Sequence, residues 1–214
     1  MTDDPAEHRW PHRWIYLPLA RVVFGIILRI LGRFKVRGRN QVPRTGGLLV
    51  VCNHLSDCDA VVVQTACPRP IHFMAKSELF EMKGIGLALK LFGAFPVKRA
   101  EADLGAVRRA VSFLKDGQVV CIFPEGKVSE DGNLQDLKPG VALLLRMSGV
   151  PVICGGIINS NLILPYGTTH PRFAAARVEF NWGEPYLFAK KSSAEEIMAW
   201  VESHLSELNR HKLT

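Results

Sequence analysis

The stretch GLLVVCNHLSDCDAVVVQTA, residues 47–66, decides the fold. Its first seven residues, 47–53, form a short and almost wholly apolar run, which predicts a buried strand. Polar residues follow, and residues 59–66 return to an apolar run. We expect this second run to be a helix, because the acidic residues at its start supply N-terminal caps. A buried strand that turns into a helix is the building unit of a layered α/β sheet.

The same alternation continues along the chain. Further strands are predicted at 71–76, 94–99, 118–123, 150–157 and 176–182, and further helices at 77–93, 102–117, 139–149 and 192–209. Strands separated by helices of 10–15 residues predict a single layered α/β domain with a largely parallel central sheet flanked by helices. The length of 214 residues suits one such domain, and an apolar fraction of 48% excludes a disordered chain.

Positive charge is concentrated at the N-terminus. The formal net charge is +7, and the first 44 residues carry nine Lys and Arg against three Asp and Glu, a balance of +6. A basic arm is typical of a protein that meets nucleic acid or an anionic membrane. The arm contains the apolar segment WIYLPLARVVFGIILRILGRF, residues 14–34. A helix this apolar is poorly suited to bind a nucleic-acid duplex. We therefore expect an anionic membrane surface as the partner, and no nucleic acid.

The apolar segment does not fit a signal peptide or a membrane-spanning helix. Three Arg residues interrupt it, and no small-residue cleavage site follows it. Pro18 is expected to limit regular helix to about residues 18–34, or ~25 Å, whereas a hydrocarbon core is ~30 Å thick. A helix that lies in the membrane interface is the remaining mode of membrane binding.

A helical projection supports an interfacial helix. Five polar or small residues share one flank, and apolar residues cover the rest. The five are Arg21, Gly25, Arg29, Gly32 and Arg33. The sequence thus predicts an amphipathic membrane-binding segment over residues 1–34, with its cations at the headgroups, followed by the α/β domain over residues 35–214. An amphipathic helix packed on its own domain is the alternative.

The cysteines indicate a reducing compartment. The five form no Cys-x-x-Cys pair, and most lie in or beside apolar runs, as expected for buried reduced thiols. They are Cys52, Cys58, Cys67, Cys121 and Cys154.

Two polar clusters directly follow predicted strands, at the sheet edge where α/β proteins bind ligands. In the first, His54 precedes Asp59 by five positions, a spacing at which a carboxylate can orient an imidazole as a general base. In the second, Glu125 and Gly126 lie in a loop where a carboxylate can bind a polyol and the glycine admits a ligand. Asp59 as a helix cap and Glu125 as a solvated acid are the alternatives.

Four blocks of sequence together carry a family resemblance. They are Asn-His-x-x-x-x-Asp at 53–59, Gly-Ala-Phe-Pro-Val-Lys-Arg at 93–99, Phe-Pro-Glu-Gly at 123–126 and Val-Pro-Val at 150–152. In this order and at about this spacing, they resemble the glycerophosphate and lysophosphatidic acid acyltransferase family over about residues 35–185. The resemblance implies an α/β domain, often with an N-terminal membrane-binding helical pair.

The resemblance also implies the activity. A fatty acyl group would pass from acyl-CoA or an acyl carrier protein to a hydroxyl of a lysophospholipid, at the cytoplasmic face of a membrane and without cofactor or metal. His54 would be the base and Asp59 its orienting partner. Arg99 would lie at the polar headgroup, while Glu125 and Gly126 would hold the glycerol portion of the acceptor.

The third block departs from the family pattern. Members that act on phosphate acceptors usually continue with Thr-Arg, where this chain has Lys127 and Val128. A phosphate would lose a bidentate clamp there. The cations that could replace it are Lys76, Lys98, Arg99, Lys127 and Lys138. Lysophosphatidic acid is therefore the first expectation for the acceptor, and another lysolipid or an amino-acid lipid is the next.

Three other interpretations remain open at the level of sequence. A metal-dependent hydrolase would use His54, Asp57 and Asp59, although no further ligand is evident. A lipid-binding protein without activity would not need the His–Asp pair. Cys58, inside the first block, would be the nucleophile of a covalent mechanism.

Overall fold

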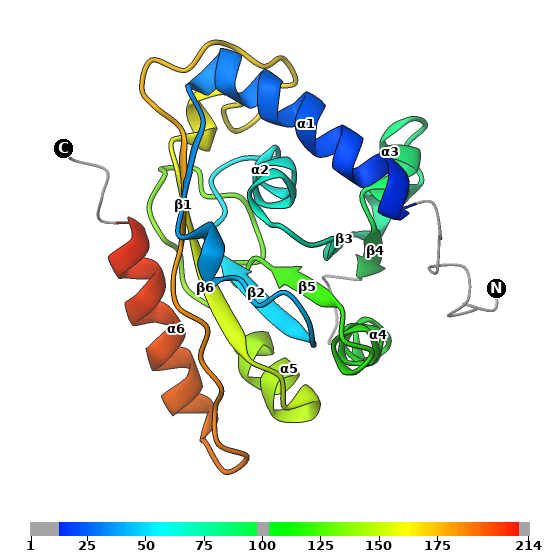
Figure 1. Ribbon diagram of the computed structural model, residues 1–214, viewed down its shortest axis with the longest axis vertical. Helices are drawn as coiled ribbons and strands as arrows, with labels where there is room; N and C mark the ends of the chain where they lie inside the picture. Colours follow the sequence, from blue (N-terminus) through cyan, green and yellow to red (C-terminus); the bar gives the residue numbers. More distant parts are fainter. Residues whose placement is uncertain (1–12, 98–102, 210–214) are drawn as a thin grey trace.

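The computed structural model describes residues 13–97 and 103–209, and these residues form a seven-stranded sheet with helices on both faces (Figure 1). The strands are β1 (Lys35–Arg37), β2 (Leu48–Cys52), β3 (Ile71–Lys76), β4 (Ala94–Val97), β5 (Val119–Ile122), β6 (Val152–Ile158) and β7 (Glu179–Trp182). The α-helices are α1 (Arg13–Gly32), α2 (Asp59–Ala66), α3 (Ile85–Leu91), α4 (Leu104–Lys115), α5 (Gly140–Ser148) and α6 (Ala194–Asn209). Short 3-10 turns are η2 (Arg39–Gln41), η3 (Ser77–Phe80) and η4 (Ser160–Leu162).

The sheet is largely parallel, as predicted. Its order is β1-β7-β6-β2-β5-β3-β4, and the five strands from β6 to β4 run in one direction. Strand β7 pairs antiparallel with β6, and β1 pairs parallel with β7. All five residues of β2 are buried, because this strand lies at the centre of the sheet with helices over both faces. The carboxyl ends of β2 and β5 therefore lie side by side.

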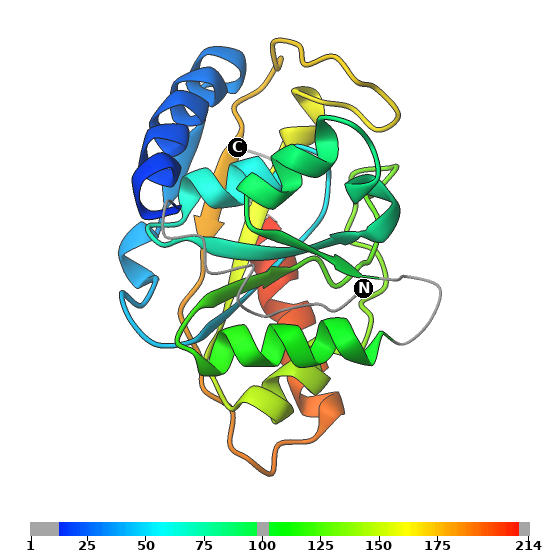
Figure 2. The same cartoon turned by 90° about the vertical axis from the view of Figure 1, so that its right-hand side faces the viewer.

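The helices form two layers (Figure 2). Helices α1, α2 and α3 cover one face, where Leu28 of α1 and Val63 of α2 join the buried cluster beneath them. Helices α4, α5 and α6 cover the other face with a second cluster that includes Ala110, Val141 and Ile197. Each helix thus buries one apolar stripe against the sheet, which is how a three-layer α/β domain encloses its core.

Most predicted elements are present, with small shifts at their ends. The predicted helix 77–93 is interrupted, as expected, where Gly84 has a φ of +83°, a conformation that favours glycine. Strand β1 was not predicted, because it has only three residues and alternates exposed and partly buried positions at the edge of the sheet. Such a strand leaves little apolar signal in the sequence.

Helix α1 is longer than predicted, and Pro18 lies inside it. The expectation that Pro18 begins the regular helix is therefore wrong. A proline in a helix removes one backbone hydrogen bond, a loss that the remaining bonds of a 20-residue helix can tolerate. Among the described residues, no helix combines the length and the apolar character needed to cross a membrane.

Part of the predicted Arg and Gly flank of α1 packs on the protein itself. Arg21 donates hydrogen bonds to the carbonyl oxygens of Gln64 (3.2 Å) and Pro68 (3.3 Å), at the end of α2. Gly32 packs so tightly that a Cβ there would lie 2.6 Å from a methyl carbon of Val178. Arg21, Gly25 and Gly32 therefore face the body of the protein, whereas Arg29 and Arg33 on the same flank are exposed. Of the apolar residues on α1, Leu28 is buried in the core, and a second group faces outward.

Candidate active site

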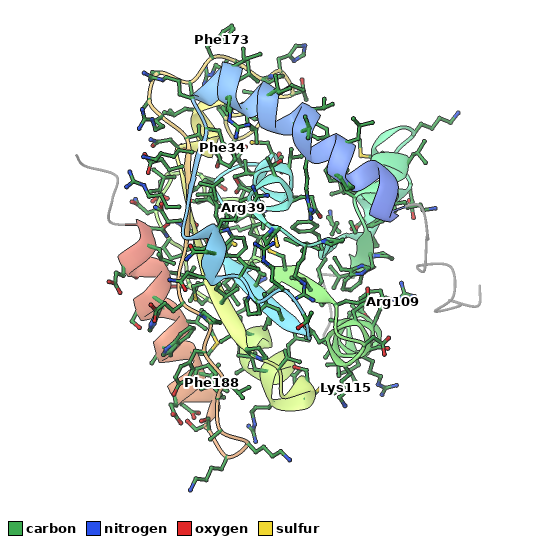
Figure 3. The ribbon with its side chains drawn as sticks, viewed as in Figure 1. Phe34, Arg39, Arg109, Lys115, Phe173 and Phe188 are labelled. Atoms are coloured by element: carbon green, nitrogen blue, oxygen red, sulfur yellow. The ribbon has the colours of Figure 1, made fainter. Side chains whose placement is uncertain are left out.

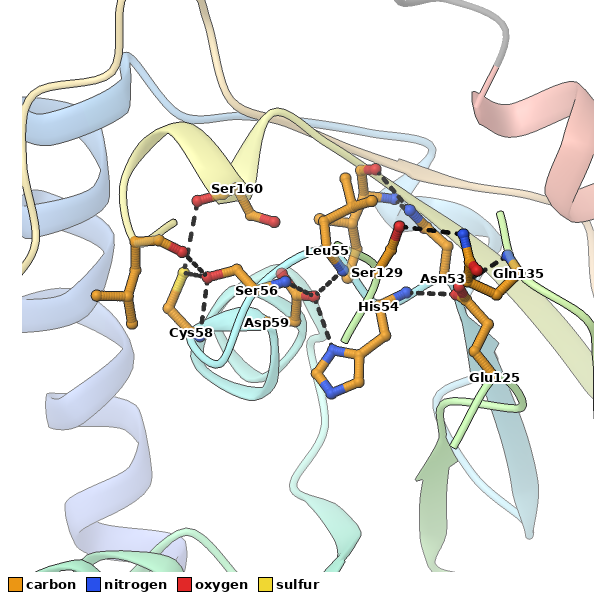
Figure 4. A network of polar contacts seen from close by, with 12 residues as sticks. Asn53, His54, Leu55, Ser56, Cys58, Asp59, Glu125, Ser129, Gln135 and Ser160 are labelled. Carbon is orange, nitrogen blue, oxygen red and sulfur yellow. Dashed lines mark hydrogen bonds and ion pairs between the residues drawn. The ribbon is translucent and has the colours of Figure 1, made fainter. Parts of the chain in front are cut away.

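The His54–Asp59 pair forms at the junction of β2 and α2 (Figure 4). Nδ1 of His54 lies 2.9 Å from Oδ2 of Asp59, and the same oxygen accepts the backbone N–H groups of Leu55 (2.6 Å) and Ser56 (2.8 Å). Asp59 is completely buried. An ionised carboxylate only accepts hydrogen bonds, so Nδ1 carries the proton and Nε2 has the free lone pair that a general base needs.

An aromatic ring fixes the plane of the imidazole. Phe123, which follows β5, stacks on His54 with ring centroids 4.2 Å apart and an angle of 16° between the planes. The ring of His54 is therefore held by Asp59 at its edge and by Phe123 on its face. Sequence reasoning quoted Phe123 as part of a block but gave it no role, because a stacking partner 69 positions away leaves no local signal.

The backbone of His54 is also held from two sides. Its N–H donates to Oε1 of Glu125 (2.7 Å), and its carbonyl accepts the N–H of Ser129 (2.8 Å). Just before it, Asn53 exchanges two hydrogen bonds with the backbone of Ile157 in β6 (2.7 and 2.9 Å). These bonds connect the end of β2 to the two strands that flank it in the sheet, directly to β6 and to β5 through the loop that follows it.

Glu125 is buried next to the backbone of His54. Its second oxygen accepts the N–H of Gln135 at 2.9 Å, so both oxygens are engaged by backbone amides, and the side chain is only 3% exposed. Burial raises the pKa of Glu125, and the two amide bonds oppose that shift. Glu125 is not among the residues that line the cavity in front of His54, whereas Gly126 is. Its predicted contact with the acceptor stays a prediction.

His54 opens onto a cavity of about 640 Å³. The walls are mostly apolar and come from α1, α2, β3, α3 and the segments beside them; they include Phe24, Val61, Phe73, Leu79, Leu89 and Phe92. The polar and charged lining residues are His54, Asp57, Lys76 and Lys138. A mostly apolar cavity that is lined by a base and two ammonium groups suits a lipid with a polar headgroup.

The predicted cations separate into three groups. Lys76 and Lys138 line the cavity, and Lys127 is exposed and does not. Lys98 and Arg99 lie outside the described residues. Val128, at the position of the family's Arg, is buried and adds no cation to the site.

Gly126 makes room for one of the two cavity lysines. Its φ is +73°, and a Cβ at this position would lie 2.6 Å from Nζ of Lys138. The glycine thus permits both the turn and the approach of the ammonium group, where any side chain would displace it.

The thiol of Cys58 is poorly suited to act as a nucleophile. Burial, followed by the charge of Asp59, raises its pKa to about 12, so the thiol stays protonated near neutral pH. It does not line the cavity, and its Sγ lies 3.2 Å from Oγ of Ser56. In residues 13–97 and 103–209, no three His, Cys, Asp or Glu side chains gather into a group that could hold a metal ion.

The His–Asp pair at the carboxyl end of the central strand places a candidate general base where α/β proteins bind their ligands. The profile of the Acyltransferase family matches residues 33–157, and the chain belongs to this family. The resemblance drawn from the four sequence blocks is thereby confirmed.

Individual relatives point in the same direction. The chain is 35% identical over 130 residues to "1-acyl-sn-glycerol-3-phosphate acyltransferase" of Bacillus subtilis, covering 60% of this chain and 64% of the relative. It is 31% identical over 157 residues to "Lyso-ornithine lipid O-acyltransferase" of Rhizobium meliloti, covering 70% of this chain and 49% of the relative. The matched region is thus less than two thirds of the length of either curated relative.

A solved structure shares the fold. The crystal structure of the 1-acyl-sn-glycerophosphate acyltransferase from Thermotoga maritima superposes with a TM-score of 0.81, at 23% sequence identity, over 100% of this chain and 85% of the other. At this identity the likeness supports the fold, including the largely parallel sheet.

Proposed function

We propose that this protein is an O-acyltransferase that moves a fatty acyl group from an acyl thioester to a hydroxyl of a lysophospholipid. One observation carries the proposal: His54, which is paired with the buried Asp59, lines a mostly apolar cavity. The base is where an acceptor hydroxyl has to be activated, and the apolar space fits a fatty chain. The donor is acyl-CoA or an acylated carrier protein, and no resident cofactor takes part.

The reaction is a direct transfer. Nε2 of His54 takes the proton of the acceptor hydroxyl while the hydroxyl oxygen forms a bond to the thioester carbonyl carbon. The carbonyl electrons move onto its oxygen, which backbone amides stabilise, and Asp59 stabilises the imidazolium. The C–S bond then breaks, and the leaving thiolate receives the proton from His54. The products are an ester and a free thiol, with no covalent enzyme intermediate.

Lysophosphatidic acid is the first choice of acceptor. The ammonium groups of Lys76 and Lys138 share the cavity with His54 and supply positive charge for a phosphate, although neither is the planar fork that Arg provides. The Bacillus subtilis relative is named for this acceptor, and the Rhizobium meliloti relative for a lyso-ornithine lipid. An amino-acid lipid is therefore the second candidate.

The decisive experiment is acyl transfer measured by product mass with the purified protein, both donors and a panel of lysolipids. Wild-type protein is expected to acylate lysophosphatidic acid, and His54→Ala to lose about 10²–10⁴-fold in kcat. His204→Ala is the matched control, because His204 lies on α6 away from the cavity and should keep full activity. Equal activity of His54→Ala and wild type would refute the assignment.

We also propose that α1 docks the enzyme as a peripheral protein on the cytoplasmic, anionic surface of a membrane. The outward side of α1 is a continuous apolar face made of Leu19, Val22, Val23, Ile26, Ile27 and Ile30. Phe173, 74% exposed, lies near the C-terminal end of α1, where the N–H of the next residue, Ala174, donates to the carbonyl of Leu31 (Figure 3). An exposed apolar face of this size marks an interaction surface, and a helix lying in the headgroup region would bury it.

A further inference from the structure

A second cavity, of about 830 Å³, lies on the opposite side of the sheet from α1. It is lined by residues of α4 and α5 together with Lys190 and Ala194; we call it the α4–α5 groove. Its floor includes Leu104, Leu143 and Met147, three apolar side chains that are exposed to solvent. The catalytic mechanism proposed above uses none of these residues.

The rim of the α4–α5 groove is basic. Arg146 of α5 and Lys190 both line it. Among the described lining residues the one carboxylate is Asp103, which caps the N-terminus of α4, where its Oδ1 accepts the N–H of Ala106 at 2.9 Å. Glu195, next to the lining residue Ala194, interacts electrostatically with Arg146. The groove thus combines an apolar floor with two cations, a combination that suits an elongated ligand with an uncharged body and an anionic end.

Gly140, the first residue of α5, links the groove to the catalytic cavity. It lines both cavities, and a Cβ built on it would have no atom of residues 13–97 and 103–209 within 4 Å. Within this part of the chain, the surface over Gly140 is therefore open. A flexible chain lying in the groove can cross this point and bring its end to the cavity in front of His54.

We propose that the α4–α5 groove binds the phosphopantetheine arm of the acyl donor. This inference rests on the proposed acyl transfer and deepens it. The arm is a narrow chain of methylene and amide groups with a thiol at one end and a phosphate at the other. Its phosphate would lie between Arg146 and Lys190, and its thioester would pass over Gly140 to His54. The acceptor would enter from the side of α1, so the two substrates would reach the base from opposite faces of the sheet.

Charge reversal tests the phosphate site. In the double variant Arg146→Glu/Lys190→Glu, the KM for acyl-CoA is expected to rise by about tenfold or more, because two charge-assisted contacts are replaced by repulsion. The KM for the acceptor and kcat at saturating donor should stay near wild type. Lys115→Glu is the matched control: it makes the same kind of charge change at the far end of α4, outside the groove (Figure 3). An unchanged donor KM in the double variant would overturn the proposal.

Binding without turnover separates this proposal from the proposed function. Titrations of His54→Ala protein with 4′-phosphopantetheine, free coenzyme A and a carrier protein bearing the arm should all detect binding. When Arg146→Glu and Lys190→Glu are added to His54→Ala, the affinity for each of the three ligands should fall. If the affinity fell for coenzyme A alone, the groove would recognise the nucleotide and not the phosphopantetheine arm that all three ligands share. That result would overturn the proposal. If wild-type protein transferred no acyl group to any acceptor while these ligands still bound, the proposed function would fail and the groove would stand.

A blocked crossing tests the route. Gly140→Phe places a large ring in open space at a helix position with ordinary backbone geometry. We expect this variant to bind 4′-phosphopantetheine as wild type does and to lose at least tenfold in kcat, because the thioester no longer reaches His54. Full kcat in a folded Gly140→Phe protein would contradict the route over Gly140.

Discussion

At the residue scale, the site depends on one oxygen atom. Oδ2 of Asp59 accepts three hydrogen bonds, two from backbone amides and one from His54. The amides fix the carboxylate, and the carboxylate fixes the imidazole. The orientation of the base is therefore set by the fold of the turn between β2 and α2, before any substrate binds.

Replacing Asp59 by Asn should separate geometry from charge. The amide can still accept a hydrogen bond through its oxygen, but it no longer stabilises an imidazolium. We expect kcat for acyl transfer to fall by about 10²–10⁴-fold with little change in the acceptor KM. Asp57→Asn is the control, because Asp57 lines the same cavity without a bond to His54. An equal fall in kcat in the two variants would mean that the total negative charge of the site matters, and that the hydrogen bond between Asp59 and His54 does not.

Replacing Glu125 by Gln can distinguish between two roles for this residue. As a support for the backbone of His54, Glu125→Gln should lower kcat about tenfold, because its NH2 group faces an amide N–H where an acceptor is needed. As a ligand of the acceptor glycerol, the role that the family resemblance implies, the same change should instead raise the acceptor KM. Steady-state kinetics with varied acceptor distinguishes the two results.

The raised pKa of Glu125 also predicts how stability depends on pH. Burial favours the protonated form of Glu125 in the folded protein, so the ionised carboxylate lowers the stability above the folded-state pKa. This loss of stability disappears as the pH falls below the pKa of the same group in the unfolded protein. The Tm of wild type relative to Glu125→Gln should therefore be highest below the unfolded pKa of 4.5, and it should decline as the pH rises through the higher folded-state pKa. A difference that grows with pH would contradict the assigned cause.

At the element scale, α1 illustrates what a helical projection can and cannot predict. The grouping of Arg21, Gly25 and Gly32 on one flank was visible in the sequence and is confirmed. The direction of that flank was not, because a guanidinium group can meet backbone carbonyls of its own protein as readily as lipid headgroups. Only the positions of Gln64 and Pro68, which follow from tertiary packing, decide between the two.

Gly32 should be the most sensitive position on α1. A methyl group there would meet Val178 at 2.6 Å and Ile163 at 2.8 Å, so Gly32→Ala is expected to destabilise the protein by about 1–3 kcal/mol. Thermal unfolding measures this change. Gly140→Ala is the contrasting variant, because its new methyl group meets no atom within 4 Å, and its Tm should stay the same or rise.

Other elements were predictable to different degrees. The strand 47–53 and the helix 59–66 follow from apolar runs, a signal that lies within the element itself. The predicted acidic cap of the helix is wrong, because the N-cap residue is Cys58 and no side chain caps the helix. In the site, His54 and Asp59 are five positions apart, so their meeting was foreseeable. The stacking of Phe123 and the bond between Glu125 and His54 depend on the pairing of β2 with β5, and no local pattern records which side chains two neighbouring strands bring together.

At the scale of the whole molecule, the apolar face of α1 and the catalytic cavity lie together. Phe24 of α1 lines the cavity, and its neighbours on α1 form the exposed face. Deleting the N-terminal segment would therefore be a poor test of membrane binding, because Leu28 and Phe34 belong to the buried core. Surface substitutions are the cleaner test.

The double variant Ile26→Ser/Ile30→Ser should weaken binding to anionic phospholipid vesicles by at least tenfold, because it removes two large apolar groups from the docking face. Vesicle sedimentation measures the bound fraction. Leu187→Ser is the matched control: Leu187 is similarly exposed, and it precedes Phe188 at the opposite end of the molecule (Figure 3). Equal vesicle binding by wild type and the double variant would argue against α1 as the docking helix.

The four-sided support of His54 has a consequence for the behaviour of the enzyme on heating. Its ring and backbone are held by Asp59, Phe123, Glu125 and Ser129, which belong to segments around the two central strands β2 and β5. Elements at the centre of a sheet open only with the whole domain, whereas peripheral loops open earlier. Thermal inactivation should therefore coincide with global unfolding, and activity and near-UV circular dichroism should decay along a single curve.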